Sequence, residues 1–114
     1  MSKIITLNEN RDFSRIYSRG RAYVSPVLVV YVLRNRHNTV RMGITTSKKI
    51  GNAVQRNRAR RVVRESFRAL LPRIRPGFDL VLVARKRTWA VKMGEVLREL
   101  SKKLAEARVL AAEI

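Results

Sequence analysis

The pattern of apolar and polar positions along the chain predicts three β-strands. Residues 23–33 are rich in β-branched and aromatic side chains, which favour a strand. Residues 40–45 alternate between apolar and polar positions, as a strand with one buried face does. A polar turn at residues 36–39 separates these two strands, and we expect them to pair as an antiparallel hairpin. Residues 78–84 form a nearly continuous apolar run, which is typical of a strand buried on both faces.

Apolar residues spaced by three and four positions predict a first helix before these strands. Asn8 is placed to cap its start, and Gly20 is placed to end it. Phe13, Ile16 and Tyr17 fall on one face of this helix. A neighbouring stripe of the same helix is basic and consists of Arg11, Arg15 and Arg19.

Two further helices are predicted in the second half of the chain. One is capped by Asn52 and runs to about residue 71, where Pro72 follows. The other is predicted to be capped by Thr88. Its apolar face consists of Met93, Val96, Leu97, Leu100, Leu104 and Ala107. The element order α-β-β-α-β-α, with room for one more short strand, predicts an α+β sandwich of helices on a sheet.

The composition narrows the class of protein. The chain has 114 residues, 46% of them hydrophobic, which suits one domain over residues 1–114. With no cysteine, it excludes a disulfide framework and a zinc ribbon, and with one histidine it excludes a His-rich metal site. That histidine, His37, lies in a polar turn and is expected to be exposed and non-catalytic. No apolar run is long enough to span a bilayer, and residues 1–6 lack a secretory apolar core, so we expect a cytoplasmic protein.

The charge points to a polyanionic partner. Lys and Arg number 26 against 8 Asp and Glu, which gives a formal net charge of +18. Residues 13–64 contain no acid at all, whereas a solvated charged surface normally mixes both signs. A generic basic surface and a membrane-binding surface are the alternatives. Membrane binding requires a basic helix with bulky apolar residues free on its other face, and here the apolar residues are needed for a core.

The helix predicted after Asn52 carries the strongest functional signal. At about 100° per residue, one of its sides is formed by Ala59, Val62, Val63, Ser66, Phe67 and Leu70. The other side is formed by Asn57, Arg60, Arg61, Arg64 and Arg68. Like charges four residues apart repel, and Glu65 alone cannot neutralise them. Because guanidinium groups bind phosphate in a bidentate manner, the helix favours a nucleic-acid partner over the alternative of a salt-bridged surface helix.

Residues 47–65 resemble the signature of the bacterial ribonuclease P protein subunit, whose core is Arg56-Asn57-Arg58. The resemblance extends to both sides of this segment in the right order and covers nearly the whole chain. Further matching residues are Asp12, Phe13, Tyr17, Gly20, Tyr31, Arg41, Met42, Gly43, Ile44, Asp79, Leu80, Ala84, Arg85 and Lys86.

The resemblance implies a fold, and it implies which roles belong to the protein and which to the catalytic RNA. The implied fold is an αβββαβα sandwich with a central mixed sheet and a left-handed βαβ crossover, the ribosomal protein S5 domain 2-like fold. The implied role is that of a small RNA-binding subunit in an endoribonuclease that removes the 5′ leader from precursor tRNA. In that family a large RNA with bound Mg²⁺ carries the catalysis, so we expect the isolated protein to be inactive and to hold no metal or cofactor. One protein per catalytic RNA is expected.

The resemblance also assigns residues to two surfaces, and no catalytic residue. For the single-stranded leader of precursor tRNA they are Phe13, Tyr17, Tyr31, Thr45, Lys48, Arg56 and Asn57. For the catalytic RNA they are Lys49, Asn52, Arg58, Arg60, Arg61, Arg64 and Arg68. Aromatic side chains in a basic groove suit unpaired bases, which stack on them. The alternative for Phe13 and Tyr17 is ordinary core packing of a helix on a sheet.

Two other functions remain open from the sequence. A ribosomal or other structural RNA-binding protein has a similar composition, and the Arg56-Asn57-Arg58 block argues against it. A helix-turn-helix DNA regulator needs two helices joined by a turn of about three or four residues, whereas the arginine-rich helix is predicted between strands.

Overall fold

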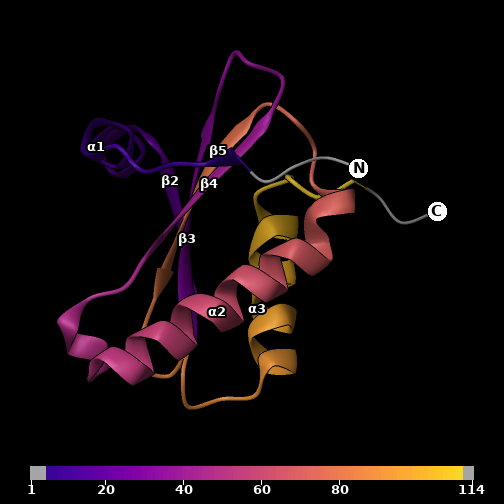
Figure 1. The fold of residues 1–114 in the computed structure, drawn as a ribbon. Helices are drawn as coiled ribbons and strands as arrows, with labels where there is room; N and C mark the ends of the chain where they lie inside the picture. Colours follow the sequence, from indigo (N-terminus) through magenta and orange to yellow (C-terminus); the bar gives the residue numbers. More distant parts are fainter. Residues whose placement is uncertain (1–4, 112–114) are drawn as a thin grey trace.

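The strands form one five-stranded sheet in the order β1-β4-β5-β3-β2, with α-helices on both of its faces (Figure 1). The computed structural model describes residues 5–111, so the predicted domain boundaries at residues 1 and 114 lie outside it. The strands are β1 (Ile5–Thr6), β2 (Arg21–Val24), β3 (Leu28–Arg34), β4 (Val40–Thr45) and β5 (Phe78–Ala84). The helices are α1 (Asn10–Arg19), α2 (Ala53–Leu70) and α3 (Met93–Glu106), with 3₁₀ turns η1 (Lys48–Ile50) and η2 (Leu71–Arg73).

The predicted hairpin between residues 23–33 and 40–45 is wrong, because β5 lies between β3 and β4. β5 pairs antiparallel with β3 and parallel with β4. The polar turn after β3 crosses the start of β5, where Asn35 N–H donates to the Gly77 carbonyl and Gly77 N–H donates to the Thr39 carbonyl. A strand that is apolar on both faces is most stable at the centre of a sheet, where both of its edges are also paired. Because β4 and β5 are parallel neighbours joined by α2, they form a βαβ unit, as the resemblance implies.

The segment predicted as one strand over residues 23–33 is in fact two strands that form a hairpin. β2 pairs antiparallel with β3, and the turn between them contains Ser25 and Pro26. The Ser25 hydroxyl accepts a hydrogen bond from Val27 N–H over 3.1 Å, which closes the turn. Proline has no N–H to donate to a sheet, so it interrupts the run of β-forming residues.

Alternation along the strands creates two separate cores. Val30, Leu80 and Leu82 face α2 and α3, where they pack with Phe67 of α2 and other buried residues in the larger core. Residues of opposite parity on the same strands face α1, where Val81 packs with Ile16 in a smaller core. Figure 1 shows α1 on one side of the sheet and α2 with α3 on the other. Both faces of β5 are therefore buried, as its apolar run predicts.

The start of α2 is fixed by the capping residue that the sequence predicts. The Asn52 side chain accepts from Gln55 N–H, and the Gln55 side chain accepts from Asn52 N–H, each over 2.9 Å. Gly51 precedes this capping box with φ +147°, and a Cβ there would lie 1.8 Å from Gln55 Oε1. The reciprocal cap therefore requires glycine at position 51, and it positions the basic residues that follow.

We expect Gly51→Ala to lower the free energy of unfolding by about 1–2 kcal/mol, because the new Cβ displaces Gln55 and strains the backbone. Gly94→Ala is the matched control, since nothing lies within 4 Å of its added Cβ in α3. The control should gain about 0.5–1 kcal/mol from the higher helix propensity of alanine. Urea denaturation measures both changes, and equal stability of the two variants would contradict the capping argument.

The starts of the other two helices differ from the predictions. α1 begins after Glu9, so Asn8 does not cap it. α3 begins after Lys92, so Thr88 does not cap it either. The buried Thr88 hydroxyl instead donates to the Val27 carbonyl and accepts from Arg85 N–H, which ties the loop after β5 to the start of β3. Val96, Leu100 and Leu104 of the predicted apolar face of α3 are buried, whereas Met93 is 41% exposed and Ala107 lies just beyond the helix.

None of the helices within residues 5–111 combines the length and the apolar character that a membrane span requires.

Candidate nucleic-acid interface

Three aromatic side chains form a cluster between α1 and the sheet. We call Phe13, Tyr17 and Tyr31 the aromatic cluster. Tyr17 meets Tyr31 edge to face with ring centroids 4.8 Å apart, and Phe13 lies 6.5 Å from Tyr17 in a tilted arrangement. The Tyr17 hydroxyl is 2.8 Å from the Thr45 hydroxyl, so one donates to the other. Four residues predicted to contact the leader are thus brought together from α1, β3 and β4.

The aromatic cluster is partly buried and partly exposed to solvent. Ile16 is the buried residue of α1, whereas Tyr17 is 39% exposed. Phe13 is half-buried and packs against the smaller core. Its ring lies directly over Gly43, where an added Cβ would come within 2.5 Å of Phe13 Cζ. Tyr17 therefore leaves the most ring surface available to a ligand, while Phe13 and Tyr31 are half-buried and pack against the smaller core.

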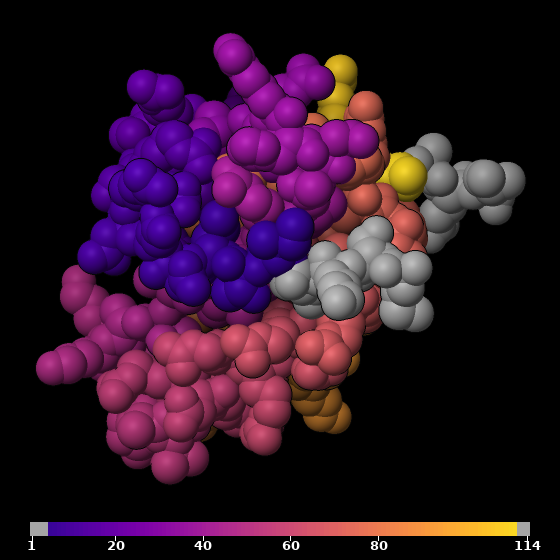
Figure 2. Space-filling view, turned by 45° about the horizontal axis from the view of Figure 1, so that its top comes forward, coloured from indigo at the N-terminus to yellow at the C-terminus, as the bar shows by residue number. Residues whose placement is uncertain are grey.

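The residues that follow β4 connect the aromatic cluster to the start of α2. Arg60 donates from Nη2 to the Thr46 hydroxyl over 2.8 Å and from Nη1 to Asn57 Oδ1 over 3.3 Å. Arg56 donates to the Gly51 carbonyl over 2.7 Å. Arg60, assigned by resemblance to the catalytic-RNA surface, therefore lies beside Thr46 at the junction of the two predicted surfaces. Figure 2 shows the indigo segment that includes α1 and the magenta-to-pink α2 on one visible face of the molecule.

The outer side of α2 carries arginines without counter-charges. We call Arg61, Arg64 and Arg68 the α2 ridge, and all three are exposed. Within residues 5–111, no carboxylate lies within 4.0 Å of a guanidinium nitrogen of any arginine on α2. Arg58 donates to the Trp89 carbonyl over 3.1 Å, so its partner is also uncharged. Lys48, Lys49 and Asn52 are exposed just before the helix.

The inner side of α2 is buried as the helical wheel predicts. Its buried residues are Ala59, Val62, Val63, Ser66, Phe67 and Leu70. Burial of this face against the sheet and α3 fixes the rotation of the helix about its axis. The charged residues of the ridge are consequently held toward solvent, and none of them forms an ion pair with a described acid.

A buried carboxylate on the α1 face of the sheet was not found by sequence reasoning. Asp79 on β5 is fully buried and accepts a bidentate pair of hydrogen bonds from Arg41, of 2.8 Å from Nε and 2.6 Å from Nη2. It also accepts from Arg15 Nη2 over 2.9 Å and from Asn35 Nδ2 over 2.8 Å. We call Asp79, Arg41, Arg15 and Asn35 the Asp79 network. The signal was present in the sequence as a single acid inside an apolar strand.

The Asp79 network favours the charged carboxylate. Burial raises the pKa of Asp79, but the hydrogen bonds from Arg41, Arg15 and Asn35 outweigh burial, so its pKa lies below the usual value. The same hydrogen bonds raise the pKa values of Arg15 and Arg41. The two arginines are therefore permanently charged and held in fixed positions on this face of the sheet.

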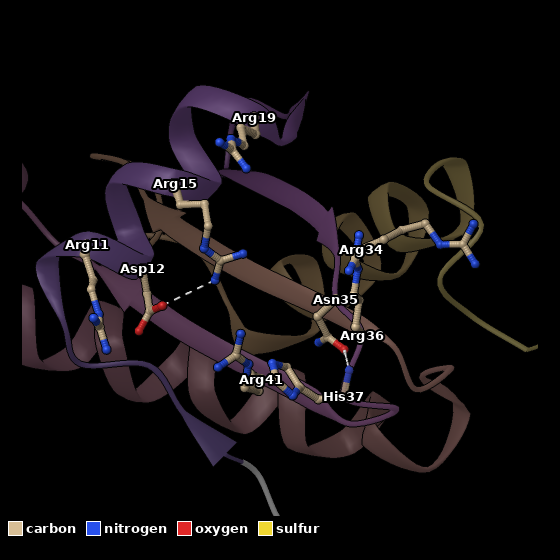
Figure 3. A pocket seen from close by; sticks show the side chains of 9 residues that line it. All are labelled: Arg11, Asp12, Arg15, Arg19, Arg34, Asn35, Arg36, His37 and Arg41. Atoms are coloured by element: carbon tan, nitrogen blue, oxygen red, sulfur yellow. Dashed lines mark hydrogen bonds and ion pairs between the residues drawn. The ribbon is translucent and has the colours of Figure 1, made fainter.

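An open hollow of about 640 Å³ lies beside the Asp79 network, between α1 and the turn after β3 (Figure 3). Its lining consists of Arg11, Asp12, Arg15, Arg19, Arg34, Asn35, Arg36, His37 and Arg41. The sequence shows the basic stripe of α1 but not that the turn and β4 complete it. His37 is exposed at the edge of the hollow, as expected. Within residues 5–111, no three His, Cys, Asp or Glu side chains are grouped as a metal site requires.

A mixed sheet with an exposed arginine-rich helix and an adjoining aromatic cluster defines a small basic α+β protein that binds nucleic acid. A family model described as Ribonuclease P matches residues 1–108, and the chain belongs to this family.

Relatives and solved structures agree with this family. The ribonuclease P protein component of Natranaerobius thermophilus is 35% identical over 100% of this chain and 99% of its own length. That of an Exiguobacterium species is 38% identical over 96% and 95% of the two chains. The structure of Staphylococcus aureus RNase P protein matches with a TM-score of 0.84 and 33% identity, over 95% of this chain and 99% of the other. The Thermotoga maritima protein matches with a TM-score of 0.80 and 32% identity, over 89% and 96%.

Proposed function

We propose that the chain assists a catalytic RNA in the endonucleolytic removal of the 5′ leader from precursor tRNA. The α2 ridge and the residues just before α2 bind the catalytic RNA, and the aromatic cluster with the start of α2 binds the single-stranded leader. The observation that carries this proposal is the set of α2 arginines, none of which has a carboxylate partner among the described residues. A folded RNA supplies the phosphates that neutralise them.

Catalysis in this proposal belongs to the RNA, with Mg²⁺ bound there. Asp79 is the one fully buried acid among the described residues, and its oxygens are occupied by Arg41, Arg15 and Asn35. It is therefore not free to bind a metal ion or to accept a proton from water. The described residues offer no ligand cluster for Mg²⁺. What the protein contributes is positive charge and a surface for unpaired bases, both of which raise the affinity for substrate.

Reconstitution tests this function. The protein is mixed with a bacterial ribonuclease P RNA at low Mg²⁺, and cleavage of a precursor tRNA at the leader junction is followed. We expect cleavage from the mixture, at a concentration of Mg²⁺ where neither component cleaves alone. Correct cleavage by the protein without RNA would overturn the assignment of catalysis to the RNA. Co-purification of the protein with ribosomal RNA instead would favour the structural RNA-binding alternative.

The leader assignment predicts a difference between precursor and mature tRNA. Tyr17→Ala should weaken binding of precursor tRNA to the holoenzyme by about tenfold and leave mature tRNA unchanged, because base stacking on an aromatic ring contributes about 1–3 kcal/mol. Tyr17→Phe is the matched control, since it keeps the ring and removes only the hydrogen bond to Thr45. We expect the control to retain most of the discrimination. Equal losses for both forms of tRNA would contradict the leader assignment.

A further inference from the structure

Thr46 contacts α2 from the end of the sheet and has no part in the function proposed above. It follows the last residue of β4 and is half-buried. Its hydroxyl accepts a hydrogen bond of 2.8 Å from Arg60 Nη2, while Arg60 Nη1 donates to Asn57 Oδ1 over 3.3 Å. We call Thr46, Arg60 and Asn57 the Thr46 clamp. The clamp ties the first turns of α2 to the segment that leaves β4.

Arg60 differs from the arginines of the α2 ridge because it is held in place. The ridge side chains are exposed, and within residues 5–111 none of them forms a hydrogen bond or an ion pair. Arg60 is half-buried, and its two partners are an uncharged hydroxyl and an uncharged amide. Its guanidinium group is therefore fixed in direction and keeps its full positive charge. A side chain that is already ordered costs less to immobilise when a ligand binds.

The clamp offers hydrogen-bond donors beside the start of α2. Because Asn57 Oδ1 accepts from Arg60, the group that exposed Asn57 has left for a ligand is its Nδ2 amide, which donates. Arg60 keeps Nε and one hydrogen on each Nη atom for a ligand. Among the described residues, no carboxylate pairs with Arg60 and competes for these donors. Neighbouring donors, one of them charged, suit a phosphate group.

The clamp adjoins the aromatic cluster through the backbone. Thr45 and Thr46 are consecutive, so their Cα atoms lie about 3.8 Å apart. The Thr45 hydroxyl is hydrogen-bonded to the Tyr17 hydroxyl over 2.8 Å, and the Thr46 hydroxyl is hydrogen-bonded to Arg60. A single peptide therefore joins the residue that anchors the most exposed ring of the cluster to the residue that anchors a charged donor.

We propose that Thr46 is a positioning residue for leader binding, which holds Arg60 where its guanidinium group binds a phosphate of the nucleotide stacked on Tyr17. Thr46 acts through Arg60 and not on the RNA itself. This places Arg60 on the leader surface, whereas the resemblance assigns it to the surface for the catalytic RNA. The inference rests on the proposed function in taking the leader as the ligand of the aromatic cluster.

Thr46→Val tests the positioning role, because it removes the hydroxyl and keeps the shape of the side chain. Affinity for precursor and for mature tRNA is measured in the holoenzyme, and affinity for the catalytic RNA is measured with the protein alone. We expect binding of precursor tRNA to weaken about fivefold, since the ligand must then order Arg60 itself. Binding of mature tRNA and of the catalytic RNA should not change. No change for precursor tRNA would overturn the inference.

Two variants serve as controls for the lost hydroxyl. Thr46→Ser keeps the donor-acceptor group and should bind precursor tRNA as the unmodified protein does. Thr39→Val makes the same replacement at a buried hydroxyl that has no hydrogen-bond partner among the described residues, so it should not affect binding. If Thr39→Val weakened precursor binding as much as Thr46→Val, or if Thr46→Ser failed to restore it, the inference would be wrong.

A double-mutant cycle separates positioning from a general effect on the fold. Arg60→Gln should weaken binding of precursor tRNA and lower the slope of log K against log salt by about 0.7, the value for one phosphate of a single strand. In this background Thr46→Val should cause no further loss, because the group that Thr46 holds is absent. A full loss in this background would overturn the inference. A loss for the catalytic RNA in place of precursor tRNA would also overturn it.

The Tyr17→Ala variant keeps this test distinct from that of the proposed function. If Tyr17→Ala weakens binding of precursor tRNA alone and Thr46→Val does not, only the inference about Thr46 fails. If neither variant separates precursor from mature tRNA, the leader assignment is contradicted, and the inference about Thr46 fails with it.

Discussion

Replacing Arg61, Arg64 and Arg68 together by glutamine should lower the affinity of the protein for the catalytic RNA by about a hundredfold, from three charge-assisted contacts of about 1 kcal/mol each. All three side chains are exposed, and none has a carboxylate partner among the described residues. Their removal therefore breaks no ion pair within the described protein and relieves repulsion along α2. We expect the fold to be retained in circular dichroism and the salt slope of binding to fall by about 3.

The control for this result is the triple replacement of Lys92, Arg98 and Lys102 by glutamine, which changes the net charge equally. An equal loss of affinity in that control would mean that overall charge, rather than the α2 ridge, holds the RNA. Replacement of the ridge arginines by lysine separates charge from geometry. Lysine keeps the salt dependence but cannot form bidentate contacts with phosphate, so an intermediate affinity is expected.

Asp79→Asn should lower the free energy of unfolding by about 3 kcal/mol, because it leaves Arg15 and Arg41 around a buried site without their counter-charge. Asp12→Asn is the matched control, since its carboxylate is 21% exposed and meets only Arg15, over 3.3 Å. Both variants raise the net charge of the chain equally. We expect the control to lose less than about 1 kcal/mol. Urea denaturation at neutral pH measures both, and similar losses would contradict the role given to Asp79.

The same network predicts how stability depends on pH. The pKa of Asp79 is lower in the folded protein than in the unfolded chain, because hydrogen bonds from Arg41, Arg15 and Asn35 overcome the effect of burial. Its contribution is therefore fully present above the unfolded pKa of about 3.9 and is lost as the pH falls through the folded pKa. In Asp79→Asn, the stability should fall less steeply below about pH 4 than in the unmodified protein. Parallel pH curves for the two proteins would contradict this.

Local signals in the sequence were sufficient to predict α2 and its two sides. Asn52 caps the helix, and the six residues predicted to face inward are the six that are buried. The helix is long, strongly periodic and bounded by clear start and stop residues. Tertiary contacts therefore did not change its predicted bounds or its predicted buried side. The grouping of Tyr17 with Tyr31 and Thr45 was also accessible, because the resemblance placed all three in one cleft.

The pairing of the strands could not be predicted from local signals in the sequence. The turn after β3 has the composition of a hairpin loop, yet it crosses β5, whose residues come some 40 positions later in the chain. Alternation fixes which face of a strand is buried but not which strand lies beside it. Thr88 was misread for a related reason. Threonine caps helices and also bonds distant carbonyls, and the Val27 carbonyl that it contacts is far away in sequence.

The Asp79 network and the hollow were missed because each is assembled from separate elements. Arg15, Asn35 and Arg41 come from α1, the turn after β3 and β4, and they meet only on Asp79 of β5. The sequence shows a lone acid in an apolar run and a basic stripe on α1, and only the fold shows that the two lie together.

The central place of β5 has a consequence for how the chain folds during synthesis. Until β5 is made, β3 and β4 each have an unpaired edge, and no strand pairing joins the β2–β3 hairpin to the β1–β4 pair. α2 precedes β5 in the chain, so the helix is complete before the sheet that orients it. Contacts of this long sequence separation form late and slow the folding of a domain. A nascent chain that stops before residue 84 therefore carries most of the positive charge, but it lacks the complete sheet that positions the charged helices.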